Sequence, residues 1–230
     1  MLNVTELWRY PIKSFRGERV NSLRFRAGGP EHDRQFMLVD DSELRRGKRL
    51  TARELQGLLG FSATFEDGAV AVVAPDGTRV RSDAADFEKR IRDMVGHPLR
   101  LHEDESGDNH DDADVLVINM ESARALSKEY GSTRSFRRFR PNIVLDGPDA
   151  QPYVELGWVG KKFTVGDLEL EAYAPNIRCA IPTIDPDTLE VDPKFLRFIV
   201  EKHDSIFGIY FRVIKGGTVH EGDEWRSVAS

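Results

Sequence analysis

The chain contains one cysteine, Cys179, within the segment YAPNIRCAIPTIDPDT (residues 173–188). Arg178 precedes it, and Pro175 and Pro182 flank it, which disfavours a regular helix through the segment. A cysteine on such a loop and beside a positive charge can present a thiolate to a ligand. A lone cysteine is more often an inert packing residue, so the segment by itself leaves both interpretations open.

A second candidate for chemistry is the arginine-rich segment STRSFRRFRPN (residues 132–142). Its arginines alternate with phenylalanines and run into Pro141-Asn142 and the apolar stretch IVL; they are Arg134, Arg137, Arg138 and Arg140. Guanidinium groups bind phosphate or carboxylate through forked hydrogen bonds that lysine cannot reproduce. We therefore expect a local anion site here. A solvated charged surface is the alternative.

Weaker signals come from the first half of the chain. Lys13 and Ser14 follow a Tyr-Pro pair, which places an ammonium and a hydroxyl on a stiff turn. Arg34 precedes an apolar stretch, and Thr51 and Arg53 stand in the segment LTARE. Each is unremarkable alone, and together they supply several groups that could hold an anion alongside those of the second half.

Length and composition restrict the class of protein. A chain of 230 residues with 40% hydrophobic residues can bury a substantial core. Its N-terminus lacks the charged-then-apolar order of a signal peptide, and no apolar stretch reaches the roughly 20 residues that span a bilayer. We expect a cytoplasmic protein without a membrane span. A single cysteine excludes an internal disulfide and a cysteine-rich zinc site.

The net charge of −6 is concentrated in one acidic segment, residues 103–114, which carries seven acids. We interpret it as a solvated connection between two halves of the chain, with docking of a basic electron donor as the alternative. Nucleic-acid binding is disfavoured because it requires a broadly basic surface.

Short strands dominate the expected fold on both sides of this segment. The pattern predicts strands or hairpins over residues 3–10, 19–26, 34–40, 61–65, 69–82, 114–120, 141–146, 161–175 and 207–225. Helices are predicted over residues 87–95, 121–130 and 193–203, with Asp86 and Asp192 as N-caps and Gly96 and Gly131 as terminators. We expect a β-rich α+β fold, because the helices are too few for repeated βαβ units.

Several segments in this order resemble the MOSC family, the proteins with a molybdenum cofactor sulfurase C-terminal domain, preceded by a MOSC N-terminal β-barrel. The resemblance is to the subgroup that includes the amidoxime-reducing component and its bacterial relatives. It rests on these segments: YPIKSFRG, DRQFMLVD, TARE, FRPNIVLDG, RCAIPTIDPDT, FGIYFRVIKGG and EGDEW. It implies an N-terminal β-barrel domain over residues 1–102, a connecting segment over 103–114 and a MOSC domain over 115–230.

The resemblance also assigns residues to a molybdenum cofactor (molybdopterin). Cys179 would be the protein's ligand to molybdenum, which suits a metal already bound by the sulfurs of the pterin. Asp112 would be the acidic residue near the metal, chosen over Asp111 and Asp114. The cofactor would be bound by the following residues: Lys13, Ser14, Arg34, Arg138, Arg140, Asn142, Arg178 and Thr183.

The implied activity is the reduction of small N-hydroxylated compounds, such as amidoximes. Some family members carry an iron–sulfur domain, for which this chain lacks the cysteines, so electrons would come from a separate donor protein. Two other functions stay open. Cys179 could bear a persulfide in a sulfur-carrier or cofactor-handling protein, or the chain could be a binding module that has lost the cofactor.

Overall fold

The structure is a computed structural model that describes residues 1–104, 109 and 112–228. Its contacts divide the chain into two compact units. The barrel unit comprises Met1–Trp8, Arg19–Glu31 and Asp111–Ser230, and the insert unit comprises Arg9–Glu18 and His32–His110. Residues 1–8 fall in the barrel unit because the first strand pairs with residues 143–146 and 224–225.

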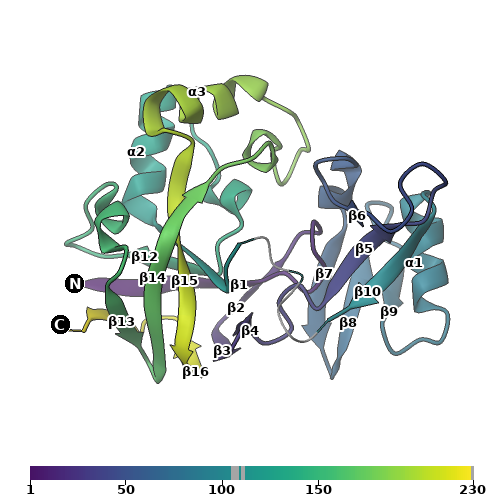
Figure 1. The fold of residues 1–230 in the computed structure, drawn as a ribbon, viewed down its shortest axis with the longest axis horizontal. Coiled ribbons are helices and arrows are strands. Elements are labelled where there is room, and N and C mark those ends of the chain that lie inside the picture. The colour runs from purple at the N-terminus through teal and green to yellow at the C-terminus, as the bar shows by residue number, and fades with distance from the viewer. Residues whose placement is uncertain (105–108, 110–111, 229–230) are drawn as a thin grey trace. The chain divides into compact units, whose positions relative to one another are not determined.

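Seven strands of the described residues close into a barrel in the barrel unit (Figure 1). Their order around the barrel is β12 (Ile143–Asp146), β11 (Val115–Asn119), β15 (Ile206–Lys215), β14 (Leu168–Ile177), β13 (Lys162–Val165), β17 (Glu224–Ser227) and β1 (Leu2–Arg9). The antiparallel pairing of β1 with β12, with Leu7 opposite Ile143, closes the ring. Only β1 comes from the first 102 residues, so the closed barrel belongs mainly to the second half of the chain.

Four further strands of the described residues complete the sheets of this unit. The strand β2 (Glu18–Val20) lies beside β1, and a three-stranded sheet has the order β16 (Gly217–His220), β3 (Ser22–Arg26) and β4 (Gly29–Pro30). The strands alternate inward apolar and outward polar residues, as in β3, where Leu23 and Phe25 are buried between exposed neighbours. The barrel interior is filled by a cluster that includes Trp158, Phe211 and Trp225.

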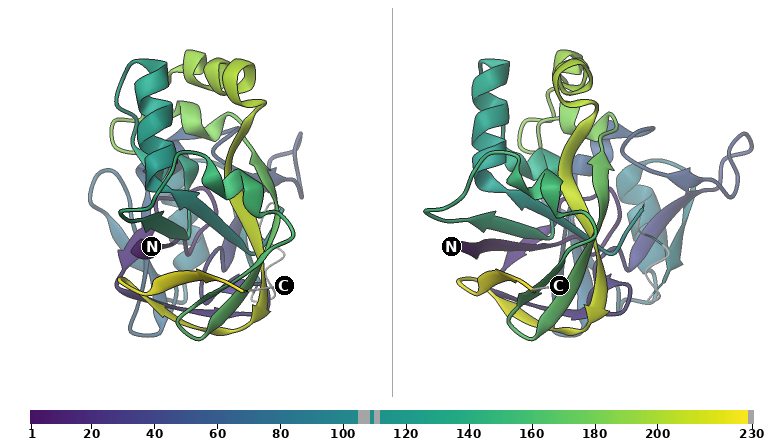
Figure 2. Two further views of the ribbon diagram at one scale, coloured as in Figure 1. Left: turned by 90° about the vertical axis from the view of Figure 1, so that its left-hand side faces the viewer. Right: turned by 60° about the vertical axis from the view of Figure 1, so that its left-hand side comes forward.

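Two helices lie at one end of the barrel (Figure 2). The helix α2 (Met120–Tyr130) begins where the Asn119 side chain accepts a hydrogen bond from the Glu121 amide, and it ends at left-handed Gly131. The helix α3 (Pro193–His203) begins where Asp192 caps the Lys194 amide. Beneath them a second apolar cluster includes Phe139, Phe195, Ile199 and Phe207. The prediction of a β-rich α+β fold is confirmed.

Two three-stranded sheets, one α-helix and the 3₁₀ helix η1 (Gln56–Gly60) lie in the part of the insert unit that the structure describes. One sheet has the order β10 (Leu99–Glu103), β5 (Phe36–Asp40) and β6 (Arg49–Leu50), and the other has the order β7 (Ser62–Glu66), β8 (Ala69–Val73) and β9 (Arg79–Arg81). The predicted hairpin over residues 69–82 and the predicted helix, α1 (Phe87–Val95), are both present. Stacked rings of Phe15 and Phe61, with centroids 5.1 Å apart, contribute to its core.

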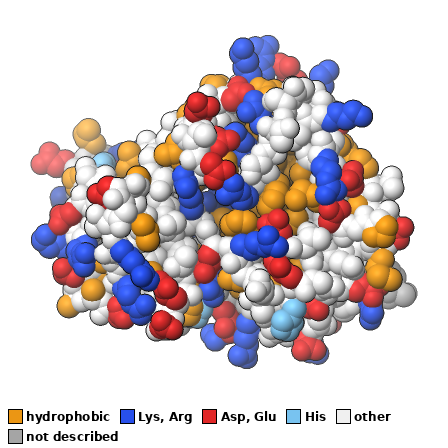
Figure 3. Space-filling view, turned by 180° about the vertical axis from the view of Figure 1, so that it is seen from behind, with side chains coloured by type: hydrophobic (Ala, Val, Ile, Leu, Met, Phe, Trp, Pro, Cys, Tyr) orange, Lys and Arg blue, Asp and Glu red, His pale blue; other side chains and the backbone are white. Residues whose placement is uncertain are grey.

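No helix within the described parts of the chain is both long and apolar enough to cross a membrane. Acidic and basic side chains are interspersed over the face of the molecule in Figure 3, rather than gathered into a field of one sign.

Candidate functional site

Cys179 lies on a loop of the barrel unit, two residues after β14 ends at Ile177. Its side chain is partly exposed rather than enclosed in the core, and it forms no disulfide. The last register pair before the loop joins Ile177 to Ile206 of β15, and the Arg178 amide then donates to the Ser205 carbonyl at 2.7 Å. The partly exposed thiol therefore lies just beyond the end of a strand pair.

Arg178 connects this loop to the arginine-rich segment. Its guanidinium carbon lies 5.1 Å from the centre of the Phe139 ring, and its Nη2 donates to the Phe139 carbonyl at 3.2 Å. Phe139 is the last residue of the short 3₁₀ helix η2 (Phe136–Phe139), and Arg140 follows it directly. The structure therefore joins Arg178, the neighbour of Cys179, to the residue that precedes Arg140, nearly forty positions earlier in the chain.

A tight turn follows the cysteine. The 3₁₀ helix η4 (Ile181–Thr183) begins after Ala180, whose carbonyl accepts hydrogen bonds from both the amide and the hydroxyl of Thr183, at 3.0 and 2.6 Å. Thr183 is 5% exposed, and its own carbonyl accepts from the Asp192 amide at 2.8 Å. Thr183 thus holds the shape of the loop that carries Cys179.

Arg138 fixes the same loop from the opposite side. The residue is 4% exposed; its Nη1 donates to the Pro182 carbonyl at 3.2 Å, and its Nη2 pairs with the Asp185 carboxylate. Burial lowers the pKa of Arg138, and the Asp185 charge opposes that effect. Burial would raise the pKa of Asp185, but hydrogen bonds from the Thr188 and Asp187 amides and the Arg138 charge hold it below its usual range.

Two neighbouring arginines also form ion pairs with aspartates. Arg134 pairs with Asp192 at 2.6 Å, and Arg137 pairs with Asp187. Together with Arg138 and Asp185, three arginines expected to form an open anion site are each matched to an aspartate of residues 185–192. Of these aspartates, Asp192 was predicted only as a helix N-cap, and Asp185 and Asp187 had no predicted role. Their signal was the opposite charge of two short segments, which spacing along the chain could not connect.

Arg140 and Asn142 differ in how their side chains are placed. Arg140 is partly exposed and adopts a left-handed backbone conformation, with φ of 57°. Asn142 is 1% exposed, and its amide accepts from the Leu116 amide and donates to the Trp8 carbonyl, both at 3.2 Å. The Asn142 side chain therefore joins β11 to β1 within the barrel.

In the insert unit, the segments with Lys13, Ser14 and Arg34 lie side by side. The Lys13 amide donates to the Phe36 carbonyl at 2.8 Å, and the Arg34 amide donates to the Tyr10 carbonyl at 2.7 Å. The Lys13 Nζ donates to the Asn109 carbonyl at 2.7 Å, and Lys13 is 6% exposed. The Arg34 guanidinium lies 4.8 Å from the centre of the Tyr10 ring.

Arg34 also forms an ion pair with Asp33. Away from this group, Thr51 donates its hydroxyl to Glu54 at 2.7 Å, which gives it a local structural partner.

Left-handed backbone conformations recur among the predicted site residues. Ser14, Arg34 and Arg140 have φ of 71°, 50° and 57°. Residues other than glycine seldom adopt this region, and such strained positions tend to cluster at functional sites.

The predicted acidic residue, Asp112, is exposed and precedes β11. Asp114 accepts a hydrogen bond from the Val213 amide at 3.1 Å and thus belongs to the strand pairing. Asp111, and the acidic positions from Glu105 to Asp108, lie outside the described residues. Within the described part of the chain, no three His, Cys, Asp or Glu side chains are grouped in a way that could hold a metal ion.

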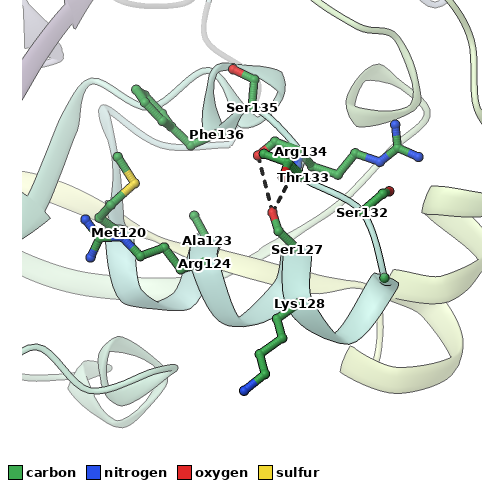
Figure 4. Close-up of a pocket in the computed structure, with 11 residues that line it drawn as sticks. Met120, Ala123, Arg124, Ser127, Lys128, Ser132, Thr133, Arg134, Ser135 and Phe136 are labelled. Carbon is green, nitrogen blue, oxygen red and sulfur yellow. Dashed lines mark hydrogen bonds between the residues drawn. The ribbon is translucent and has the colours of Figure 1, made fainter.

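A pocket of about 590 Å³ in the barrel unit lies between α2 and residues 131–136 (Figure 4). Ser127 and the backbone of Arg134 exchange hydrogen bonds across it, at 3.1 and 3.3 Å. The Arg134 side chain extends away from Met120 and Ala123 in this view. Cys179 is absent from the described residues that line the pocket.

Comparison with known proteins connects these features to a family. The family model described as the MOSC domain matches residues 104–226, and that described as the MOSC N-terminal beta barrel domain matches residues 1–120. Mitochondrial amidoxime reducing component 2 of Bos taurus is 24% identical, over 96% of this chain and 81% of its own length. Mitochondrial amidoxime-reducing component 1 of Mus musculus is 26% identical, over 96% and 80%.

A third relative is the molybdenum cofactor sulfurase of Caenorhabditis elegans, 27% identical over 91% of this chain and 33% of its own length. Among solved structures, the YUAD protein from Bacillus subtilis has a TM-score of 0.54 at 19% identity, over 98% of this chain and 94% of that one, which shows a shared fold. The two family models together span residues 1–226, and the chain therefore belongs to the MOSC domain family, with the MOSC N-terminal β-barrel domain preceding the MOSC domain.

Proposed function

We propose that this protein is a molybdenum cofactor-dependent oxidoreductase that reduces small N-hydroxylated compounds of the amidoxime type, with Cys179 as the protein's ligand to molybdenum. The observation that carries the proposal is the partly exposed thiol of Cys179 on a loop beside Arg178. Relatives named amidoxime reducing components and a molybdenum cofactor sulfurase, each similar over more than nine tenths of this chain, support a role connected with this cofactor.

The residues around Cys179 fit such a cofactor chemically. A soft thiolate suits a metal whose other ligands include sulfur, and a single protein ligand leaves coordination positions for substrate. The cofactor also carries a phosphate, for which arginine is a suitable partner. Arg178 contacts Phe139, and Arg140 follows Phe139 directly in the chain. These groups provide donors for an anionic ligand.

In this proposal the cofactor supplies the electron pair that cleaves the N–O bond, which with two protons yields the parent amidine and water. The chain's own residues have other tasks. Cys179 holds the metal through its thiolate, Arg140 and Arg178 bind anionic groups of the cofactor, and Asp112 is the acidic residue assigned near the metal. A separate donor protein returns the electrons.

Lys13, Ser14 and Arg34 remain predicted cofactor-binding residues with a test of their own. Their support is the convergence of two separate segments of the insert unit and the left-handed conformations of Ser14 and Arg34. Thr183 and Asn142, whose side chains are engaged with backbone groups, would contribute by shaping the loop and the strand end.

A second candidate function is sulfur transfer, with a persulfide on Cys179. The similarity to the molybdenum cofactor sulfurase over 91% of this chain favours it. In that case Cys179 would carry a sulfane sulfur and would not bind a metal.

The deciding experiment is elemental analysis of full-length protein produced in a host with ample molybdenum and cofactor. The oxidoreductase proposal predicts molybdenum near one atom per chain, reduction of benzamidoxime with a chemical electron donor, and loss of that activity in folded Cys179→Ala. Full turnover by Cys179→Ala would refute it. Protein that holds a persulfide but no molybdenum after cofactor loading would support the carrier instead.

A further inference from the structure

The backbone on either side of Cys179 is held in different ways. Before the cysteine, the pairing of β14 with β15 extends to Ile177, and the Arg178 amide is fixed to Ser205. After the cysteine, the chain leaves the sheet and makes the η4 turn, whose hydrogen bonds to Ala180 are local. A short 3₁₀ turn has poor hydrogen-bond geometry, so it needs contacts from elsewhere to stay in one place.

Arg138 supplies those contacts. Its Nη1 donates to the carbonyl of Pro182, in the middle of η4, and its Nη2 pairs with Asp185 just beyond the turn. The Arg138 side chain is 3% exposed and that of Asp185 is 23% exposed, so the contact with Pro182 is buried and the contact with Asp185 is partly buried. A guanidinium can hold two acceptors at fixed directions at once, so one side chain constrains both the middle of the turn and the segment just beyond it.

Asp185 itself holds the following turn together through hydrogen bonds to residues 187, 188 and 190. Its Oδ1 accepts from the Asp187 and Thr188 amides at 2.9 and 3.0 Å, while its Oδ2 faces Arg138. The Asp185 amide donates to the Glu190 carbonyl at 2.8 Å. The contact with Arg138 therefore links the cysteine loop to a rigid turn rather than to a single flexible side chain.

We propose that Arg138 is a positioning residue for Cys179, which it serves by holding the Pro182 carbonyl and the Asp185 carboxylate in place. This inference rests on the proposed function of Cys179 as a ligand to molybdenum, because only a thiol that binds a ligand must be held in a fixed orientation. Arg138 acts three residues away from the sulfur, through the turn. Removing Arg138 takes away the buried partner of a partly buried ion pair, which is more disruptive than removing one partner of an exposed pair.

The chain contains a matched control in the same pair of segments. Arg137 and Asp187 are also paired, but their side chains are 35% and 52% exposed. An exposed pair contributes little to local order. Arg137→Gln therefore changes the charge of the segment by the same amount as Arg138→Gln, without releasing the η4 turn.

The test uses the full chain without cofactor. Because Cys179 is the sole cysteine, alkylation by iodoacetamide reports on this residue alone, and the Arg137→Gln control accounts for the effect of the lost charge on the thiolate. Arg138→Gln is expected to raise the alkylation rate about tenfold, the factor for losing one hydrogen bond to a charged group. Hydrogen exchange should increase at residues 180–184 and stay unchanged in β13 and β14. Arg137→Gln should match the wild type.

A conservative substitution of Arg138 distinguishes an effect on the position of Cys179 from a general loss of protein stability. Arg138→Lys keeps a charge that can pair with Asp185 but cannot hold Pro182 at the same time, so its alkylation rate should lie between those of the wild type and Arg138→Gln. In cofactor-loaded enzyme, Arg138→Gln should lower kcat with little change in KM. Asp185→Asn provides the same test from the other partner if Arg138→Gln does not fold.

Equal alkylation rates in Arg138→Gln and Arg137→Gln would overturn the proposal, as would exchange that rises uniformly across the barrel strands. These outcomes are distinct from failure of the proposed function. Protein that never binds molybdenum would refute the oxidoreductase and leave the alkylation result unaffected.

Discussion

The guanidinium of Arg178 lies over the ring of Phe139, 5.1 Å from its centre, and donates a hydrogen bond to the carbonyl of the same residue at 3.2 Å. This double contact ties the residue before Cys179 to the end of η2. Phe139 is itself fixed from below, with its ring centre 4.0 Å from that of Phe207. A buried aromatic residue thus gives the cysteine loop and Arg140 a common support.

Arg178→Met tests whether the positive charge of Arg178 contributes to binding of the cofactor. Methionine keeps an apolar stem over the Phe139 ring and removes the guanidinium. We expect molybdenum and pterin content to fall several-fold while the melting temperature drops by only about 2–4 °C, the effect of roughly 1 kcal/mol in a chain of this size. The control is Arg212→Met, since the Arg212 guanidinium lies over the Tyr173 ring in the same manner at an exposed position of β15. Equal cofactor content in both variants would argue against a ligand role for Arg178.

Lys13→Met examines the predicted cofactor residues of the insert unit. The Lys13 Nζ is nearly buried and donates to the Asn109 carbonyl, so its loss leaves a buried acceptor unsatisfied at a cost of about 1–3 kcal/mol. If Lys13 also binds the cofactor, pterin fluorescence per chain should fall beyond what the lower stability explains. Lys48→Met, at an exposed position of the same unit, should retain full pterin content. Unchanged pterin content in Lys13→Met would remove this residue from the assignment.

Two nearby aspartates are expected to behave in opposite ways. Asp114 accepts from the Val213 amide, so Asp114→Ala, which removes the acceptor, should lower the melting temperature and leave the turnover of the remaining folded enzyme unaltered. Asp112 is exposed, so Asp112→Asn should leave the melting temperature unaltered and reduce kcat if it acts near the metal. Thermal unfolding and steady-state kinetics on both variants decide the matter. Wild-type kcat in Asp112→Asn would end the assignment of that residue.

Asp40 gives the stability of the insert unit a defined dependence on pH. Burial would raise the pKa of Asp40, but hydrogen bonds from Ser42 and the nearby His97 lower it to about 2. A depressed pKa stabilises the folded state above the ordinary value near ~3.9. That stabilisation is lost as the pH falls from about 4 to about 2. Calorimetry should show a steep loss of stability in this window for the wild type and a shallower one for Asp40→Asn. Identical slopes would contradict the attribution.

Local structure was largely predictable from the sequence because its signals are local. The Asp192-Pro193 pair predicted the start of α3, and Gly96 and Gly131 predicted the ends of α1 and α2, since each sits in the left-handed conformation that terminates a helix. Barrel closure was not predictable in the same way. It depends on β1 pairing with β12 and β17, which lie more than a hundred residues away in the chain.

The candidate site shows the same limit. Cys179 on a loop beside a cation could be inferred from the flanking prolines and Arg178. The role of Arg138 could not be inferred, because its partners Pro182 and Asp185 are more than forty residues away in the chain. The sequence of an arginine cluster also does not show whether its side chains bind a ligand or pair with aspartates. Asn142 was expected at the cofactor, yet its amide joins two strands.

X-ray absorption at the molybdenum edge measures the central claim, that the Cys179 sulfur binds the metal, most directly. Wild-type protein loaded with cofactor is compared with Cys179→Ser loaded in the same way. Our account predicts that the variant loses one sulfur from the molybdenum coordination shell and gains a lighter ligand. The same sulfur count around molybdenum in both proteins would contradict it.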